Sequence, residues 1–134
     1  MKKQSIIQVF WILLMSLLLV SMLLMFTSCG NPLGEREYLE DIYIDIPDTD
    51  CRLLIKEWRY LLGSGEDVYF VSPSEKEPRL LGKLTGGDDG YCPFNDGKYK
   101  VEFSDGSVRI FWCFNGSDTR YTRSERFVLP EIPD

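Results

Sequence analysis

Two hydrophobic patterns divide the chain. Residues 6–26 form an apolar run without a charge, whereas the later residues alternate between apolar and polar positions over short stretches. A long apolar run predicts a hydrophobic helix, and alternation with a period of two predicts strands with one buried face. We therefore expect a hydrophobic helix at 6–26, a short tether at 29–37 and a small β-domain at 38–134.

The best-defined element is a hairpin around Asp105 and Gly106. Two residues of this type between alternating runs predict a tight turn, because both must tolerate positive φ. If Ser104 pairs with Ser107, one side of the hairpin is wholly apolar. That side carries Tyr99, Val101, Phe103, Val108, Ile110 and Trp112.

Other runs of the same kind predict further strands at 41–46, 67–72, 79–84 and 121–129. Turn residues separate these runs at short intervals, as in small antiparallel folds. The expected fold class is therefore all-β: an antiparallel meander, sandwich or barrel.

Residues 51–62 fit two descriptions. As a helix they would begin after Asp50, end before Gly63 and have one apolar face. That face would carry Cys51, Leu54, Ile55, Trp58, Leu61 and Leu62. As a strand they would join the strand at 67–72 through a hairpin turn across residues 63–66. The sequence leaves a strand and a single helix both open.

Composition and charge narrow the possible functions. The chain has 134 residues and no histidine, which excludes histidine-dependent catalytic triads and HExxH zinc sites. It has 15 basic and 21 acidic residues, for a net charge of −6. Sequence-independent binding of nucleic acid needs clustered Lys and Arg, so no nucleic-acid partner is expected.

The amino terminus has the features of an export signal. Lys2 and Lys3 precede the apolar run, and all acidic residues follow it, so the lysines are expected to stay on the cytoplasmic side. The residues that follow, Phe26-Thr27-Ser28-Cys29-Gly30, resemble a bacterial lipobox. The resemblance implies that residues 1–28 are a lipoprotein signal peptide, removed when Cys29 receives a diacylglyceryl group with fatty acyl chains such as palmitate. The remainder would then be a lipid-anchored protein of the cell membrane, facing outside the cytoplasm.

Two other outcomes are compatible with this segment. The run at 6–26 would reach roughly 31 Å as a helix, which is enough for an uncleaved membrane span. A secretory signal that releases a soluble product is the third possibility. All three place residues 30–134 outside the cytoplasm.

The cysteines suggest one disulfide. With Cys29 lipidated, Cys51, Cys92 and Cys113 remain, an odd number for an oxidising location. The hairpin register places Cys113 opposite Lys98, and the turn residues between Cys92 and Lys98 bend the chain back. A Cys92–Cys113 bond is therefore expected, with Cys51–Cys92 as the alternative. Three unpaired buried thiols remain a further possibility.

The sharpest candidate for a metal site lies at residues 86–97. This glycine-rich stretch contains Asp88, Asp89, Asn95 and Asp96. Hard oxygen ligands on a bent loop are what Ca²⁺ requires, although the spacing is not that of an EF-hand. The same residue types also build turns without any metal.

Aromatic residues suggest a binding surface. Phe111 falls on the opposite side of the predicted hairpin from Trp112, beside Arg109. An exposed ring at this position could bind sugar faces or peptide side chains.

These observations favour a membrane-anchored binding or structural module of the cell envelope, with no specific role defined. Its partners would be the bilayer, through acylated Cys29, and an envelope protein or glycan. A Ca²⁺-stabilised envelope enzyme acting on carbohydrate or peptide is one alternative. An accessory subunit of a membrane complex is another. No residue pattern identifies a catalytic site.

Overall fold

A computed structural model describes residues 2–28 and 34–131, and the side chains of the first stretch are described for residues 6–21. The chain forms two units, Met1–Gly34 and Glu35–Asp134. The first unit contains α1 (Lys2–Ser28), which includes the predicted apolar helix at 6–26. Among the residues described, no helix is long and apolar enough to cross a membrane.

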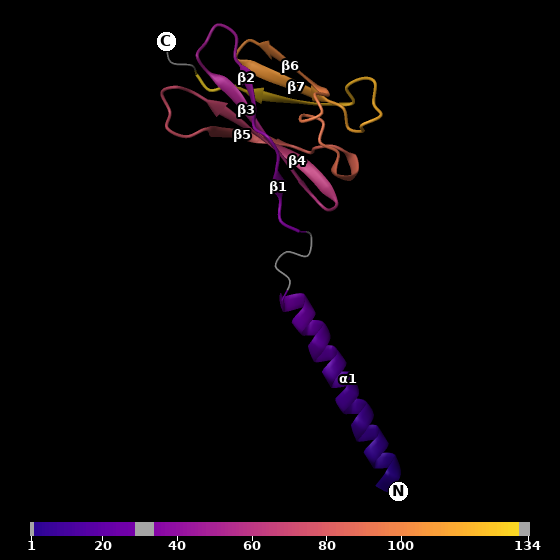
Figure 1. Cartoon of the computed structure of the whole chain (residues 1–134). Coiled ribbons are helices and arrows are strands. Elements are labelled where there is room, and N and C mark those ends of the chain that lie inside the picture. The colour runs from indigo at the N-terminus through magenta and orange to yellow at the C-terminus, as the bar shows by residue number, and fades with distance from the viewer. Residues whose placement is uncertain (1, 29–33, 132–134) are drawn as a thin grey trace. The chain divides into compact units, whose positions relative to one another are not determined.

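The second unit is built from two antiparallel sheets (Figure 1). The first sheet has the order β1-β3-β4-β5, with β2 also paired to β3, and the second has the order β6-β7-β8. This confirms the predicted all-β fold. The strands are β1 (Glu37–Tyr38), β2 (Ile42–Asp45), β3 (Arg52–Tyr60), β4 (Gly63–Val71), β5 (Arg79–Leu84), β6 (Tyr99–Ser104), β7 (Ser107–Trp112) and β8 (Arg123–Val128).

The core lies between the two sheets. Both sheets contribute inward-facing apolar side chains to one continuous cluster, as expected when two sheets stack face to face. Its buried members are Ile46, Cys51, Leu53, Ile55, Val68, Phe70, Leu84, Phe94, Val108, Ile110 and Trp112.

The predicted hairpin is confirmed in register. Ser104 pairs with Ser107, and Tyr99 pairs with Trp112 at the far end of β6 and β7. Asp105 and Gly106 have φ values of 41° and 69°, the positive φ that this tight turn requires. Local turn chemistry and alternation agree here, which is why the sequence determines the register.

The segment at 51–62 contains strand β3 (Arg52–Tyr60) and no helix. The turn that follows is at Leu61 and Leu62, which are exposed, and not across residues 63–66 as the hairpin interpretation expected. The Gly63-Ser64-Gly65 stretch begins β4 instead. A Cβ atom at Gly65 would lie 2.4 Å from Cζ2 of Trp58, so glycine is needed there because an indole ring crosses the strand.

The other predicted strands are present, and any difference lies at their ends. Strand β1 was not predicted, and its first residue, Glu37, belongs to the segment expected as a tether. The strand predicted at 79–84 has the predicted bounds, whereas the one predicted at 67–72 begins earlier, at residue 63. The strands predicted at 41–46 and 121–129 are shorter, at 42–45 and 123–128.

Candidate functional site

Two carboxyl side chains face each other inside the sandwich. Glu57 of β3 and Glu66 of β4 are a direct cross-strand pair, and both residues are 0% exposed. Alternation along β3 places Glu57 on the same face as Leu53 and Ile55, which belong to the core. Buried carboxyl groups need hydrogen-bond partners, and here a distant loop provides them.

Glu57 binds the loop before β6. Its Oε1 atom accepts a hydrogen bond from the backbone N–H of Phe94 at 3.0 Å. Its Oε2 atom accepts from the backbone N–H of Asn95 at 2.7 Å and from Nδ2 of Asn95 at 2.8 Å. Three donors from one short segment therefore hold residues 94–95 against β3.

Glu66 and Ser64 bind the start of the same loop. Oε2 of Glu66 accepts from the N–H of Gly86 at 3.0 Å, and Oγ of Ser64 accepts from the N–H of Gly87 at 3.0 Å. The Ser64 hydroxyl also donates to the carbonyl of Tyr91 at 2.7 Å. We name Glu57, Ser64 and Glu66 the polar clamp, because together they fix both ends of residues 86–95.

Glu66 is protonated at neutral pH. Burial raises the pKa of Glu66 to about 8, and the neighbouring Glu57 carboxylate contributes to the rise. Its Oε1 atom is buried and has no hydrogen-bond partner among residues 34–131. A proton on Glu66 avoids placing two negative charges opposite each other in the core.

The four candidate metal ligands are divided between two places. Asp88 and Asp89 line an open pocket with Phe114 and Arg123, whereas Asn95 and Asp96 line a different pocket. Asn95 is bound to Glu57, and Oδ2 of Asp96 accepts a 2.7 Å hydrogen bond from the Tyr91 hydroxyl. Within the described residues no group of three potential ligands is placed to hold a metal ion. The calcium site stays a prediction without geometric support.

Cys51, Cys92 and Cys113 are free thiols in the described domain, so neither the Cys92–Cys113 nor the Cys51–Cys92 bond is formed in this structure. The Sγ atom of Cys113 lies 3.6 Å from the carbonyl oxygen of Arg120, and that of Cys92 lies 3.5 Å from the carbonyl oxygen of Gly90. Burial, with a smaller contribution from Glu57, raises the pKa of Cys92 to about 11. This thiol is therefore a weak nucleophile at neutral pH. Cys29 lies outside the described residues.

The predicted platform at Phe111 lies on the outer surface of the second sheet. Phe111 is half-buried, its ring centroid lies 6.4 Å from that of Tyr121, and the Arg109 guanidinium lies 5.9 Å above it. The small pocket beside Arg109 is lined by polar side chains and not by Phe111. Arg109 therefore lines this polar pocket, whereas Phe111 lies outside it in a small cluster with Tyr121.

A larger aromatic surface lies on the first sheet, facing away from the core. Its rings come from β1 to β4, and several are exposed: Tyr38 by 52% and Tyr43 by 51%. Leu54, between Tyr43 and Tyr69 in the register, is only 2% exposed. We name this surface the aromatic face; its residues are Tyr38, Tyr43, Trp58, Tyr60 and Tyr69.

Trp58 is fixed at the centre of this surface. Its ring lies across Gly65, is stacked with Tyr60 at a centroid distance of 5.8 Å, and is covered by the Arg36 guanidinium at 4.2 Å. Its Nε1 atom is buried without a hydrogen-bond partner in the described part of the chain. Gly65 on one side and Arg36 on the other therefore hold the indole ring in place on the sheet.

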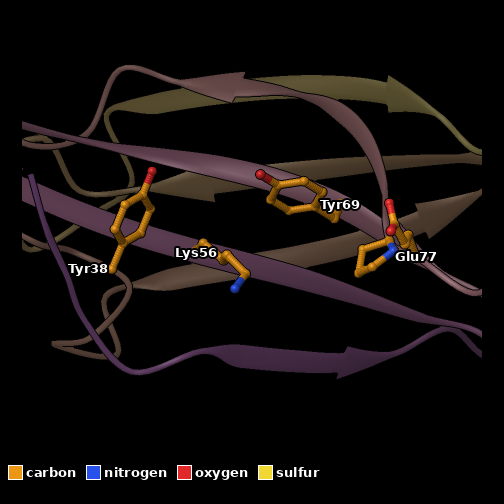
Figure 2. A pocket seen from close by; sticks show the side chains of 5 residues that line it. Tyr38, Lys56, Tyr69 and Glu77 are labelled. Carbon is orange, nitrogen blue, oxygen red and sulfur yellow. The ribbon is translucent and has the colours of Figure 1, made fainter.

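An open pocket of ≈ 430 Å³ lies on the aromatic face (Figure 2). Tyr38, Lys56 and Tyr69 line it from the sheet, and Glu77 and Pro78 line it from the segment between β4 and β5. Figure 2 shows Lys56 between the two tyrosine side chains, with Glu77 beyond Tyr69. The pocket combines the flat apolar surfaces of its rings with two hydrogen-bonding groups of opposite charge, the Lys56 ammonium and the Glu77 carboxylate.

The charges around this pocket largely compensate each other. Nζ of Lys56 lies 3.3 Å from Oδ2 of Asp41, and Nζ of Lys83 lies 3.9 Å from Oδ1 of Asp67. The second distance is too long for a hydrogen bond, so Oδ1 of Asp67 is buried without a partner among the described residues. Burial raises the pKa of Tyr69, with smaller contributions from Asp67 and Tyr38. The Tyr69 phenol therefore stays neutral and able to donate.

The sequence alone revealed neither the polar clamp nor the aromatic face, although it contains a signal for each. If residues 51–62 are read as a strand, alternation places Glu57 with Leu53 and Ile55, and it places Lys56 with Trp58 on the opposite face. Because a helix remained possible for residues 51–62, neither the buried group nor the exposed group of side chains was recognised. The pairing of β1 with β3, which adds Tyr38 to the aromatic face, joins residues that are separated in the sequence by the whole of β2.

No known protein family, curated protein or solved structure matches the chain. The functional argument therefore depends on the chain's own residues.

The polar clamp makes stability depend on pH. Because folding raises the pKa of Glu66 from 4.5 to about 8, the folded protein retains a proton that the unfolded chain loses in this window. The Glu66 contribution to stability is fully present below pH 4.5 and is lost as the pH rises toward about 8. Glu66→Gln keeps a neutral side chain, so we expect the variant to gain stability over the wild type as pH rises through the window.

The measurement is denaturant unfolding of the full chain in detergent at a series of pH values. Glu125→Gln, an exposed acid on β8, serves as the control and should follow the wild-type curve. Parallel pH profiles for Glu66→Gln and wild type would contradict a buried proton on Glu66.

Proposed function

We propose that the chain is a lipid-anchored, extracytoplasmic binding protein of the bacterial cell envelope, and that the aromatic face is its binding surface. The lipobox-like residues 26–30 support the anchor, and the lysines before the apolar run support the orientation. The pocket between Tyr38 and Tyr69 is the observation that carries the binding role.

The tether and the charge of the domain keep the aromatic face accessible. Residues 29–37 connect the proposed lipid to the domain, and β1 begins at Glu37. All acidic residues of the chain lie beyond the apolar run, so anionic lipid headgroups repel the domain. A domain held close to the bilayer without lying flat on it remains free to meet a ligand of the envelope.

The arrangement of carboxyl groups favours binding over catalysis. The carboxyl pair that most resembles an acid–base couple, Glu57 and Glu66, is buried in the core, where no substrate reaches it. The exposed pocket instead offers two rings, one ammonium and one carboxylate. Rigid aromatic rings with a few polar groups are typical of recognition surfaces.

The anchor is tested by the intact mass of the chain extracted from bacterial membranes. We expect a product that lacks residues 1–28 and carries diacylglyceryl on its first residue, Cys29. Cys29→Ser should prevent both changes, whereas the matched variant Cys51→Ser should not. A wild-type mass without lipid would contradict the anchor.

The binding surface is tested by retention on cell-wall material from which membranes have been removed, with the full chain held in lipid nanodiscs. The double variant Tyr38→Ala/Tyr69→Ala should reduce retention by about tenfold or more, because exposed aromatic anchors contribute over 1 kcal/mol each. Tyr121→Ala removes a ring that is 45% exposed elsewhere on the domain and should have no effect. Equal retention of the double variant and the wild type, or no retention of either, would refute the assigned surface.

A further inference from the structure

We propose that the pocket on the aromatic face binds a neutral glycan chain, with Tyr38 and Tyr69 stacking on separate sugar rings and Lys56 and Glu77 hydrogen-bonding to hydroxyl groups. This inference rests on the proposed function, because it names the ligand class of the same surface. Three observations support it: the register of the strands, the charges of the pocket lining, and the hydrogen bonding of the backbone around the pocket.

The strand register places Tyr38 and Tyr69 diagonally across β3, with their Cα atoms far apart. Tyr38 pairs with Trp58, and Tyr69 pairs with Leu54, on opposite sides of β3. Four residues along β3 and two strand spacings across it put their Cα atoms about 16 Å apart. Lys56 lies midway along β3 between the two positions. The two side chains line one pocket from opposite sides of β3, so a ligand that stacks on each ring separately needs more than one ring of its own.

The charges of the lining disfavour an anionic ligand. Lys56 and Glu77 have opposite charges, and Lys56 is paired with Asp41 at 3.3 Å. A phosphate would therefore lack the cluster of cations that it requires. Sugar hydroxyl groups both donate and accept, so they can use an ammonium, a carboxylate and two phenols together.

The aromatic rings favour the flat, C–H-rich faces of sugars. The negative face of an aromatic ring attracts the partly positive hydrogens of an aliphatic surface. Tyr38 is 52% exposed, so a large part of its surface is available for such contact. The Tyr69 phenol remains neutral, and its hydroxyl can donate to a sugar oxygen beside the stacked ring.

The backbone beneath the pocket disfavours an extended peptide. Peptides that bind sheets commonly add a strand to a free edge and pair with its main chain. Here β3 is paired on both sides, and β4 is paired with β3 and β5. The carbonyl of Glu57, in the gap between β1 and β2, accepts from the N–H of Leu39 at 2.9 Å. Beneath the pocket, β3 and β4 therefore offer only their side chains to a ligand, which suits a glycan.

The test uses the full chain in nanodiscs and linear oligomers of glucose, mannose, xylose and N-acetylglucosamine, each from two to six units long. We expect one of these series to bind, with affinity rising as the oligomer becomes long enough to reach both tyrosines. Tyr38→Ala and Tyr69→Ala should each weaken that binding about tenfold, whereas Tyr69→Phe should retain the stacking contribution. Tyr121→Ala is the control and should bind as the wild type does.

The outcomes separate this inference from the proposed function. If no neutral oligomer binds, but wall retention still requires Tyr38 and Tyr69 and protease treatment of the wall removes it, the ligand is a peptide and the glycan inference is wrong. If only anionic polymers of the wall retain the protein, the glycan inference is also wrong. If retention does not depend on these two tyrosines, the proposed function itself fails.

Discussion

Strand β3 is the element on which the rest of the structure depends, because one of its faces packs in the core and the other belongs to the aromatic face. One face, with Leu53, Ile55 and Glu57, is fully buried against the second sheet. The other face carries Lys56 and Trp58 between flanking strands. Side chains alternate strictly along a strand, so a shift of one residue in register would exchange the two faces. The core, the polar clamp and the aromatic face are therefore specified together.

The buried carboxyl pair orders a loop against the core. The polar clamp exchanges apolar packing for hydrogen bonds that hold residues 86–95 over one end of the sandwich. The Nε1 atom of Trp112 adds a bond from the second sheet to the carbonyl of Gly86 at 3.1 Å. A loop rich in glycine and aspartate has little apolar surface of its own, so buried polar partners are needed to order it. Its aspartates serve turns and surface contacts in this arrangement.

How much the sequence could predict depended on the range of the interactions involved. The hairpin at Asp105 and Gly106 was predictable to the residue, because its turn and its alternation are both local. Strand β3 was left ambiguous, because the apolar residues at 51–62 also fit one face of a helix that begins after Asp50 and ends before Gly63. The aromatic face and the polar clamp were not predicted, since the strand at 52–60 was left open and each feature also requires segments separated in the sequence to pair or dock.

The central claim is that the aromatic face meets a ligand of the cell envelope. Hydroxyl-radical footprinting of the lipid-anchored protein, with and without wall material, tests it directly and without altering the chain. The account predicts that oxidation of Tyr38 and Tyr69 falls when wall material is present, while oxidation of Tyr121 does not change. Equal oxidation of all three tyrosines in both conditions, or protection of Tyr121 alone, would contradict it.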